Sequence, residues 1–358
     1  MKIKGAFLFF AVFVWMATGV AQEFDNQIFE DPTLVAAENQ EAELAYNQGV
    51  SQFRNGNYEA ALSSFGKSIT YDPNFAKAYL NRGSAHVQLT NYDAAIADFS
   101  KATELNQTLG IAYFNRARVY DMVLKTDSAY LDYSTAIENR FDDYRVYYYR
   151  GVIEFLRQKY DAAVADFTLS INIKEDFAYA WNDRASAKRM LENYLGAIED
   201  YGQAIKLDPQ LALAYSNLGS AKRRQGDNHG ALEEYNLAIK MDSTLPLVWN
   251  NRGCARFNLE DFEGAVSDFE YVIVLNEEYS IAHNNLGTAL IKLKKYDEAI
   301  VALSKAIELN PKFGEAYLNR GNAREMIRDV NGACLDWRQA INNGILQAKS
   351  FVIFCEND

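Results

Sequence analysis

The chain has 358 residues and a formal net charge of −12, with 48 acidic against 36 basic side chains. This acidic balance argues against a nucleic-acid partner and against binding to anionic membrane surfaces. Proline is scarce while tyrosine and phenylalanine are abundant, which favours helices that pack through aromatic side chains.

The first 21 residues have the pattern of an export signal peptide. Lys2 and Lys4 precede an apolar run over residues 5–16, and the small residues 19–21 stand before Gln22. The run is short for a permanent membrane span, so we expect cleavage before Gln22 and no membrane insertion afterwards; a retained N-terminal anchor is the alternative. The residues before the cleavage point are typical of bacteria, and we expect a periplasmic or extracellular location, in a Gram-negative cell.

A strict 34-residue period dominates the rest of the chain. Residues 22–41 are acidic and are expected to form a loose lead-in. From residue 49 to residue 321 a small residue recurs at every 34th position, without insertion or deletion: Gly49, Gly83, Ala117, Gly151, Ala185, Gly219, Gly253, Gly287 and Gly321. Such a period predicts one structural unit stacked on copies of itself, with buried area that grows linearly along the array.

Each unit is predicted to contain two short helices. We number positions 1 to 34 within a unit; in residues 76–109, positions 4, 8 and 11 lie on one helical stripe, and positions 20, 24 and 27 lie on a second stripe after a turn. Small residues at positions 8 and 20 allow the two backbones to approach, and the aromatic at position 24 fills the remaining space. Position 20 is alanine in every unit: Ala61, Ala95, Ala129, Ala163, Ala197, Ala231, Ala265, Ala299 and Ala333.

This pattern closely resembles the tetratricopeptide repeat, whose 34-residue helix-turn-helix unit has these residues at these positions. The match covers residues 42–347, with departures at Thr126 in the third unit and Trp337 in the ninth. The resemblance implies an all-α, right-handed superhelical solenoid whose first helices line a concave groove. Residues 348–358 are expected to cap nine repeats: 42–75, 76–109, 110–143, 144–177, 178–211, 212–245, 246–279, 280–313 and 314–347.

Asparagine recurs at position 6, which points away from the packed stripe of the first helix. A row of amides inside the groove could hold the backbone of an extended peptide, because an amide both donates and accepts hydrogen bonds. The alternative is that these amides bond the neighbouring repeat or cap local turns. The row comprises Asn47, Asn81, Asn115, Asn217, Asn251, Asn285 and Asn319.

Two further features of the first four repeats suggest peptide contacts. At position 5, Tyr46, Phe114 and Tyr148 offer apolar surface, although aromatics on helix flanks are commonly part-buried. The resemblance also implies a partial carboxylate clamp, in which Lys77 and Arg145 join Asn81 and Asn115 of the row. Tyr149 replaces the last arginine of that clamp, which puts its second charge contact in doubt.

Arginine at position 7 always occurs together with aspartate at position 23. The six pairs are Arg82 with Asp98, Arg116 with Asp132, Arg150 with Asp166, Arg184 with Asp200, Arg252 with Asp268, and Arg320 with Asp336. We interpret them as structural ion pairs, either within a unit or onto the next. Arg184→Leu is expected to destabilise the fold, and adding Asp200→Ala is expected to recover part of the loss.

Three cysteines remain. Cys334 and Cys355 could form a disulfide that pins the end of the array, or stay as two unpaired small residues. Cys254 is expected on the groove side, but the pattern places no base beside it.

No motif for catalysis accompanies the repeats. A serine–histidine–aspartate order, a glycine-rich phosphate loop, paired catalytic carboxylates and a histidine-rich metal motif are all missing from the sequence. We therefore expect no enzyme activity, cofactor or metal, and expect a scaffold that binds a peptide or partner protein in its groove. Alternatives are an accessory subunit that presents substrate to a cell-envelope enzyme or to an assembly or secretion machine, and a self-assembling array; the sequence does not indicate the oligomeric state.

Overall fold

The chain is all-α. The computed structural model describes residues 39–356, and within this range it contains nineteen α-helices and no strand. The signal peptide predicted over residues 1–21 and nearly all of the lead-in lie outside the described residues. The first described helix begins at Gln40, two residues before the predicted boundary, because Asn39 caps it by accepting hydrogen bonds from the backbone N–H groups of Glu41 and Ala42.

Nine helix pairs follow one another, as predicted. The first helices are α2 (Gln40–Arg54), α4 (Ala76–Gln88), α6 (Gly110–Met122), α8 (Tyr144–Leu156), α10 (Ala178–Met190), α12 (Ala212–Arg224), α14 (Pro246–Asn258), α16 (Ser280–Lys292) and α18 (Gly314–Met326). The second helices are α3 (Tyr58–Tyr71), α5 (Tyr92–Leu105), α7 (Thr126–Glu138), α9 (Tyr160–Ile173), α11 (Tyr194–Leu207), α13 (Asn228–Met241), α15 (Phe262–Leu275), α17 (Tyr296–Leu309) and α19 (Val330–Asn342). The short helix α20 (Lys349–Val352) comes last, between two 3₁₀ turns.

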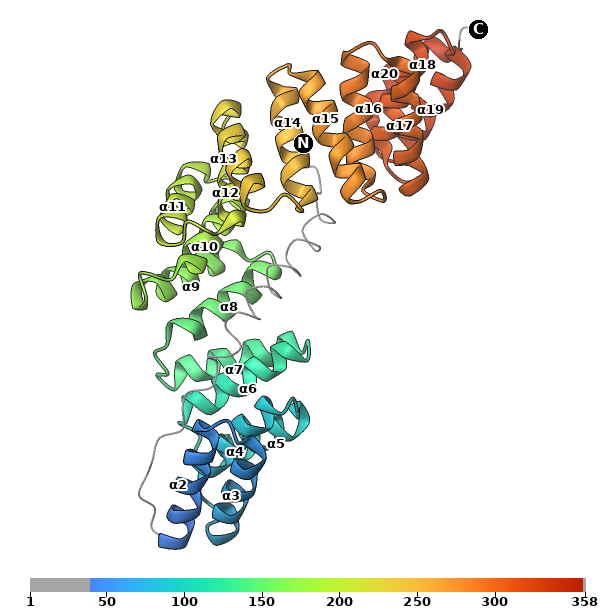
Figure 1. Cartoon of the computed structure of the whole chain (residues 1–358). Helices are drawn as coiled ribbons and strands as arrows, with labels where there is room; N and C mark the ends of the chain where they lie inside the picture. The colour runs from blue at the N-terminus through green and yellow to red at the C-terminus, as the bar shows by residue number, and fades with distance from the viewer. Residues whose placement is uncertain (1–38, 357–358) are drawn as a thin grey trace. The chain divides into compact units, whose positions relative to one another are not determined.

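The described helices divide into two compact units, one that ends at Ile173 and one that begins at Lys174. Within each unit, the two helices of a repeat pack on each other, and the second helix packs on the first helix of the next repeat. In Figure 1 the labels α2 and α3 mark one such pair, and α18 and α19 mark another. Each repeat therefore contacts its immediate neighbours, as in other repeat arrays.

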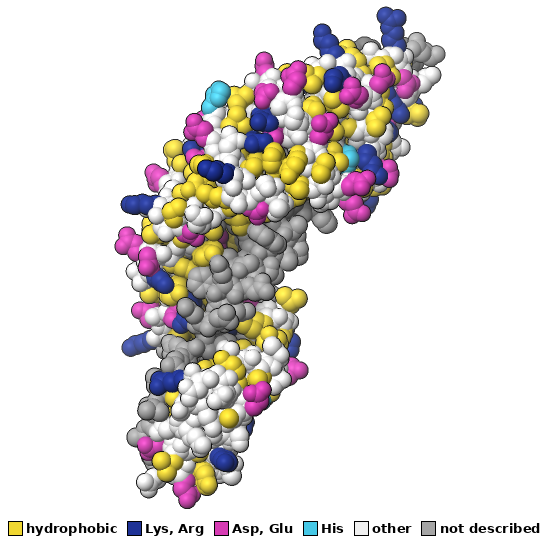
Figure 2. All heavy atoms as spheres, in the orientation of Figure 1, with side chains coloured by type: hydrophobic (Ala, Val, Ile, Leu, Met, Phe, Trp, Pro, Cys, Tyr) yellow, Lys and Arg dark blue, Asp and Glu magenta, His cyan; other side chains and the backbone are white. Residues whose placement is uncertain are grey.

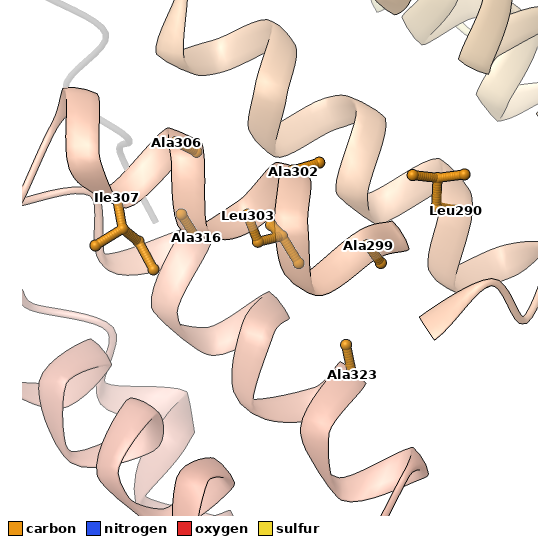
Figure 3. Close-up of a cluster of buried hydrophobic side chains, with 8 residues drawn as sticks. All are labelled: Leu290, Ala299, Ala302, Leu303, Ala306, Ile307, Ala316 and Ala323. Atoms are coloured by element: carbon orange, nitrogen blue, oxygen red, sulfur yellow. The ribbon is translucent and has the colours of Figure 1, made fainter. Parts of the chain in front are cut away.

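The core of each repeat depends on small residues facing a large side chain. All nine alanines at position 20 have no exposed surface. A Cβ atom added to Gly83 would lie 2.7 Å from the Phe99 ring, so the close helix approach requires glycine there. Figure 3 shows the equivalent cluster of repeats 8 and 9, where Leu303 lies among the alanines of α17 and α18.

A left-handed residue at position 15 turns the chain from the first helix to the second in every repeat. Repeats 1 and 6 have glycine there, with φ of 75° and 91° at Gly56 and Gly226. The other seven repeats place a non-glycine residue in this conformation, which is mildly unfavourable for residues with a Cβ. These residues are Thr90, Leu124, Gln158, Glu192, Glu260, Lys294 and Arg328.

Repeats 3 and 9 end differently from most of the others. Six repeats end in a turn where Asp or Asn at position 31 accepts a hydrogen bond from the backbone two residues later, as Asp72 does from Asn74 at 3.0 Å. Position 31 of repeats 3 and 9 is instead a left-handed residue, Arg140 (φ 59°) or Gly344 (φ 91°). The following residue, Phe141 or Ile345, then packs on glycine at position 1 of its own repeat.

Candidate functional site

All six predicted arginine–aspartate pairs form, and each lies within a single repeat. The Nε and Nη2 atoms of the arginine on the first helix donate to the two carboxylate oxygens of the aspartate on the second helix, over distances of 2.6–3.0 Å. The aspartates are buried, from Asp268 at 1% exposed to Asp132 at 6%. This bidentate geometry fixes the two helices of a repeat against each other.

A second cation at position 11 reaches the same carboxylate in several repeats, which the sequence analysis missed. Lys188 lies 2.7 Å from Asp200, Arg256 lies 2.9 Å from Asp268, and Arg324 lies 3.0 Å from Asp336. In repeat 6, which lacks the position-7 arginine, Lys222 pairs with Glu234 at 2.6 Å. The sequence carried no clear signal for it, because aspartate at position 23 also occurs with Tyr120 and Glu154 at position 11.

Several position-6 asparagines donate to position 5 of the preceding repeat. Within the second unit, the Nδ2 atom of Asn285 donates to Asn250 at 3.0 Å, and that of Asn319 donates to Asn284 at 3.1 Å. Asn217 makes a longer contact of 3.4 Å to Asn182. In the first unit, Asn81 donates to the Tyr46 hydroxyl at 2.6 Å. These amides therefore join successive first helices, whatever else they bind.

The aromatic side chains at position 5 do not offer the surface that we expected. Tyr46 and Phe114 are 1% exposed and Tyr148 is 3% exposed. Position 5 is buried in every repeat of the described chain, including the polar residues Asn182, Ser216, Asn250 and Asn284. The expectation was wrong because a helical wheel of one helix does not show that neighbouring helices cover position 5.

Two position-6 amides have no hydrogen-bond partner within residues 39–356. Asn115 is 2% exposed, and its Oδ1 atom is buried without a partner. Position 5 of the preceding repeat is Leu80 there, which cannot hydrogen-bond. Asn251 is half-buried on α14 and forms no hydrogen bond with the described residues. Asn47 is half-buried on α2.

The two basic residues of the implied clamp have different environments. The Arg145 guanidinium pairs with Asp143, with contacts of 2.6 and 2.9 Å, and lies 5.3 Å from the centre of the Phe114 ring. Lys77 is exposed in the first turn of α4. Arg145 therefore already has a carboxylate partner in this structure, which weakens its assignment to a clamp.

A buried polar cluster in repeats 3 and 4 was not predicted. The Arg118 guanidinium, 3% exposed, stacks 3.7 Å from the centre of the Tyr149 ring and lies 3.7 Å from Asp121. The Tyr133 hydroxyl donates to Asp121 at 2.5 Å. Burial raises the pKa of Asp121 to about 6, although Arg118 and Tyr133 act in the opposite direction.

The cysteines divide into a disulfide and one free thiol. Cys334 and Cys355 are bonded, with their Cα atoms 5.8 Å apart, and Phe351 of α20 stacks on Trp337 of α19 at 5.2 Å. Cys254 is free and half-buried on α14. Burial raises the pKa of its thiol, while the charges of Arg223 and Arg224 lower it. The net rise leaves this thiol less reactive than an ordinary cysteine.

Residues 39–356 contain no group of three or more His, Cys, Asp or Glu side chains placed to hold a metal ion. Over the same range, every helix is too short or too polar to cross a membrane. On the face visible in Figure 2, acidic and basic side chains are interspersed over the helices.

Comparisons with known proteins agree with this architecture. Sequence models described as tetratricopeptide repeat match residues 46–108, 212–245 and 280–313, and a model described as TPR repeat matches residues 187–226. The comparison with curated proteins found no match.

Solved structures are similar to the chain at low sequence identity. YrrB, described as a TPR protein with an unusual peptide-binding site, is 19% identical over 52% of this chain and 96% of its own, with a TM-score of 0.50. A chain of the APC/C hetero-tetramer Cut9-Hcn1 is 16% identical over 96% of this chain and 82% of its own, with a TM-score of 0.56. A tetratricopeptide repeat protein from Parabacteroides merdae is 18% identical over 70% of this chain and 99% of its own, with a TM-score of 0.48. At these identities the first two support the fold alone.

Proposed function

Because the chain is a tetratricopeptide-repeat protein, we propose that it is a scaffold that binds an extended segment of a partner protein along its first helices. Tetratricopeptide-repeat proteins mediate protein–protein interactions, and the fold is typically non-catalytic. We call the surface that carries the position-6 asparagines Asn47, Asn81, Asn115, Asn217, Asn251, Asn285 and Asn319 the first-helix face. YrrB is described as having a peptide-binding site, and peptide binding by this chain is our extension of that observation.

The observation that supports this proposal best is a pair of position-6 amides, the half-buried Asn251 and the buried Asn115, whose side chains have no hydrogen-bond partner among residues 39–356. A buried polar atom without a hydrogen bond costs about 1–3 kcal/mol, so its presence needs a compensating role. Alanine at a helix interior is more favourable than asparagine by roughly 0.6 kcal/mol, so the helix itself does not call for the amide. The half-buried amide of Asn251 is accessible to the backbone of a bound peptide. The Asn115 Oδ1 atom is covered, so a peptide N–H can donate to it only when the side chains above it move aside on binding.

The test compares capture of a partner with stability. Residues 22–358 and the double variant Asn115→Ala/Asn251→Ala are used in a cross-linking pull-down from native envelope extract. The variant is expected to capture the partner at least about tenfold less, because amide contacts act through their number, yet to melt at an equal or higher temperature, because it loses no internal hydrogen bond. Asn172→Ala/Asn342→Ala, on exposed positions of second helices, is the matched control.

Two outcomes would contradict the proposal. Equal capture by the native protein and the Asn115→Ala/Asn251→Ala variant would move binding away from the first-helix face. A variant that melts well below the native protein would instead indicate a structural role for the two amides. If the captured partner is a cell-envelope enzyme or a component of an assembly or secretion machine, the scaffold is its accessory subunit.

We also propose that the protein is exported and works in an oxidising compartment. The Cys334–Cys355 disulfide supports this, since structural disulfides persist mainly outside the cytoplasm. Mass spectrometry of the protein from its native cell is expected to find an N-terminus at Gln22 and no free thiol at Cys334. An intact N-terminus, or both thiols reduced, would contradict the proposal.

A further inference from the structure

The last turn of α12 carries two arginines that pair with no carboxylate. Arg223 and Arg224 occupy positions 12 and 13 of repeat 6, and neither forms an ion pair with any residue in 39–356. Their neighbour Lys222, by contrast, pairs with Glu234 at 2.6 Å. In a chain with 48 acidic and 36 basic residues, two adjacent cations without an internal counter-charge stand out.

Arg223 lies beside a buried tyrosine of the second helix. Its guanidinium is close enough to the Tyr235 hydroxyl to act against the rise that burial causes in the pKa of that phenol, and the hydroxyl also bonds the Ser220 hydroxyl at 3.1 Å. The Nε atom of Arg223 is buried and has no hydrogen-bond partner. The interaction of cations with the helix C-terminus accounts for arginine in the last turn, but it does not account for a guanidinium beside a buried tyrosine hydroxyl.

The same three residue types occur in the preceding repeat. Ser186, Arg189 and Tyr201 stand 34 residues before Ser220, Arg223 and Tyr235, and the Tyr201 hydroxyl bonds Ser186 at 2.9 Å. In the sequence, repeats 5 and 6 alone combine serine at position 9, arginine at position 12 and tyrosine at position 24. Successive repeats therefore orient arginines in the same way, which lowers the entropy lost when a ligand binds them.

These arginines adjoin the first-helix face of α14. Helices α12 and α14 are in contact with each other. The charges of Arg223 and Arg224 at the end of α12 also act on the Cys254 thiol of α14, in agreement with that contact. Asn251 lies three residues before Cys254 on that helix, and it is the half-buried amide without a hydrogen-bond partner. Two arginine side chains of α12 and the unpaired amide of Asn251 on α14 thus lie on neighbouring first helices.

We propose that Arg223, Arg224 and Asn251 form a site for an acidic, extended segment of a partner protein, with glutamate or aspartate carboxylates on the arginines. The proposal rests on the peptide-binding function above, and it adds that the part of the partner bound at Arg223 and Arg224 is acidic. Guanidinium groups donate to carboxylates through charge-assisted hydrogen bonds, and the Asn251 amide can bond the segment's backbone alongside.

The test measures binding of a defined peptide to residues 22–358 by fluorescence anisotropy. The probe is a fluorescein-labelled peptide of alternating glutamate and alanine, and its counterpart has glutamine for glutamate. We expect the glutamate peptide to bind at least about tenfold more tightly than the glutamine peptide. Arg223→Gln/Arg224→Gln should weaken glutamate-peptide binding about tenfold, equal to about 1.4 kcal/mol, and raised salt should weaken it further.

Two further variants keep the result interpretable. Lys206→Gln/Lys240→Gln removes the same charge from exposed positions of second helices, and its affinity should stay within about twofold of native. Arg224→Gln alone changes an exposed side chain with no internal partner, so its melting temperature should be native while it loses several-fold in affinity. This single variant stands in if loss of the Arg223–Tyr235 contact unfolds the repeat.

Several outcomes would overturn the site. The first is equal affinity for the glutamate and glutamine peptides. The second is an equal loss of affinity for the glutamate peptide in the Arg223→Gln/Arg224→Gln and Lys206→Gln/Lys240→Gln variants. The third is an arginine variant that loses self-association but keeps its affinity for the peptide. If the partner captured from envelope extract is retained by the arginine variant but lost from Asn115→Ala/Asn251→Ala, the acidic site is wrong while the proposed function stands.

Discussion

At the scale of single residues, the buried aspartates at position 23 depend on different numbers of cations. Asp200 is held by both Arg184 and Lys188. In repeat 4, position 11 is Glu154, so Arg150 is the only cation within 4.0 Å of Asp166 among the described residues. Losing the arginine therefore leaves a buried, uncompensated carboxylate in repeat 4 but not in repeat 5.

The first prediction compares these two repeats. Arg150→Leu should destabilise the protein by about 3 kcal/mol, because removing one partner of a buried ion pair leaves the other charge unpaired. Arg184→Leu should have a smaller effect, since Lys188 remains 2.7 Å from Asp200. Adding Asp166→Ala to Arg150→Leu should recover part of the loss. Urea denaturation followed by circular dichroism measures all four proteins; equal effects in both repeats, or additive losses in the double variant, would refute this account.

The second prediction concerns Asp121. Its pKa is raised by burial to about 6, so its protonation favours the folded state. This contribution is complete below the ordinary carboxyl pKa and is lost as the pH rises through about 6. Asp121→Asn should therefore exceed the native protein in stability by about 2 kcal/mol at pH 7.5 and match it at pH 4. Urea midpoints at several pH values test this; a difference between the two proteins that is independent of pH would contradict it.

Some of these side-chain contacts could be predicted from the sequence, and others could not. The arginine–aspartate pairs were predictable because position 7 and position 23 change together while the period stays constant. The second cation at position 11 could not be found by the same comparison, because repeats 3 and 4 combine aspartate at position 23 with Tyr120 and Glu154 at position 11. The burial of Tyr46, Phe114 and Tyr148, and the Arg118 cluster, depend on how neighbouring helices cover a side chain, which residue spacing within one helix does not contain.

At the scale of elements, helix number and type followed from the period, but the turns that end repeats 3 and 9 did not. Gly110 and Gly314 occupy position 1 in these two repeats, where the residue after the left-handed turn approaches closely. A Cβ atom on Gly110 would lie 2.6 Å from the Phe141 Cβ and 3.2 Å from the Ala136 carbonyl oxygen. The glycine and the turn therefore require each other, a pairing that the repeat pattern alone obscured.

The third prediction follows from that close approach. Gly110→Ala should destabilise the protein by about 1–3 kcal/mol, because backbone and Cβ atoms have to move to make room. Gly202→Ala is the matched control: a Cβ there meets nothing within 4 Å on α11, so it should stabilise by up to about 1 kcal/mol. Thermal melts of both variants test whether Gly110 and the turn at residues 140–141 require each other. A Gly110→Ala protein as stable as the native protein would show that the turn can move aside without loss of stability.

At the scale of the whole molecule, stability is expected to be local, because the extensive helix contacts within residues 39–356 join the helices of one repeat or of adjacent repeats. The core of repeat 9 is covered by α20: Phe351 packs on Trp337, and the disulfide ties Cys355 to α19. The capping segment predicted from the sequence thus has a defined packing partner. Loss of the cap should affect the nearest helices and leave the first unit unchanged.

The fourth prediction tests that locality. Cys355→Ser should lower the local stability of repeat 9 by about 3 kcal/mol, since the disulfide closes a loop of 21 residues. Hydrogen–deuterium exchange should speed up in α18, α19 and α20 but not in α4 or α5. Reduction of the native protein should reproduce the pattern. Faster exchange throughout the chain would contradict nearest-neighbour stability.

The contacts at fixed separations also restrict how the length of this protein can change. Ion pairs join residues 16 apart within a repeat, and hydrogen bonds between asparagine side chains join residues 35 apart in adjacent repeats. One residue inserted into a first helix would rotate everything after it by about 100° and misalign both sets of contacts at once. A duplicated or deleted block of 34 residues would leave every partner in register. Duplication by whole repeats is therefore the mildest route by which such a protein could acquire a longer binding surface.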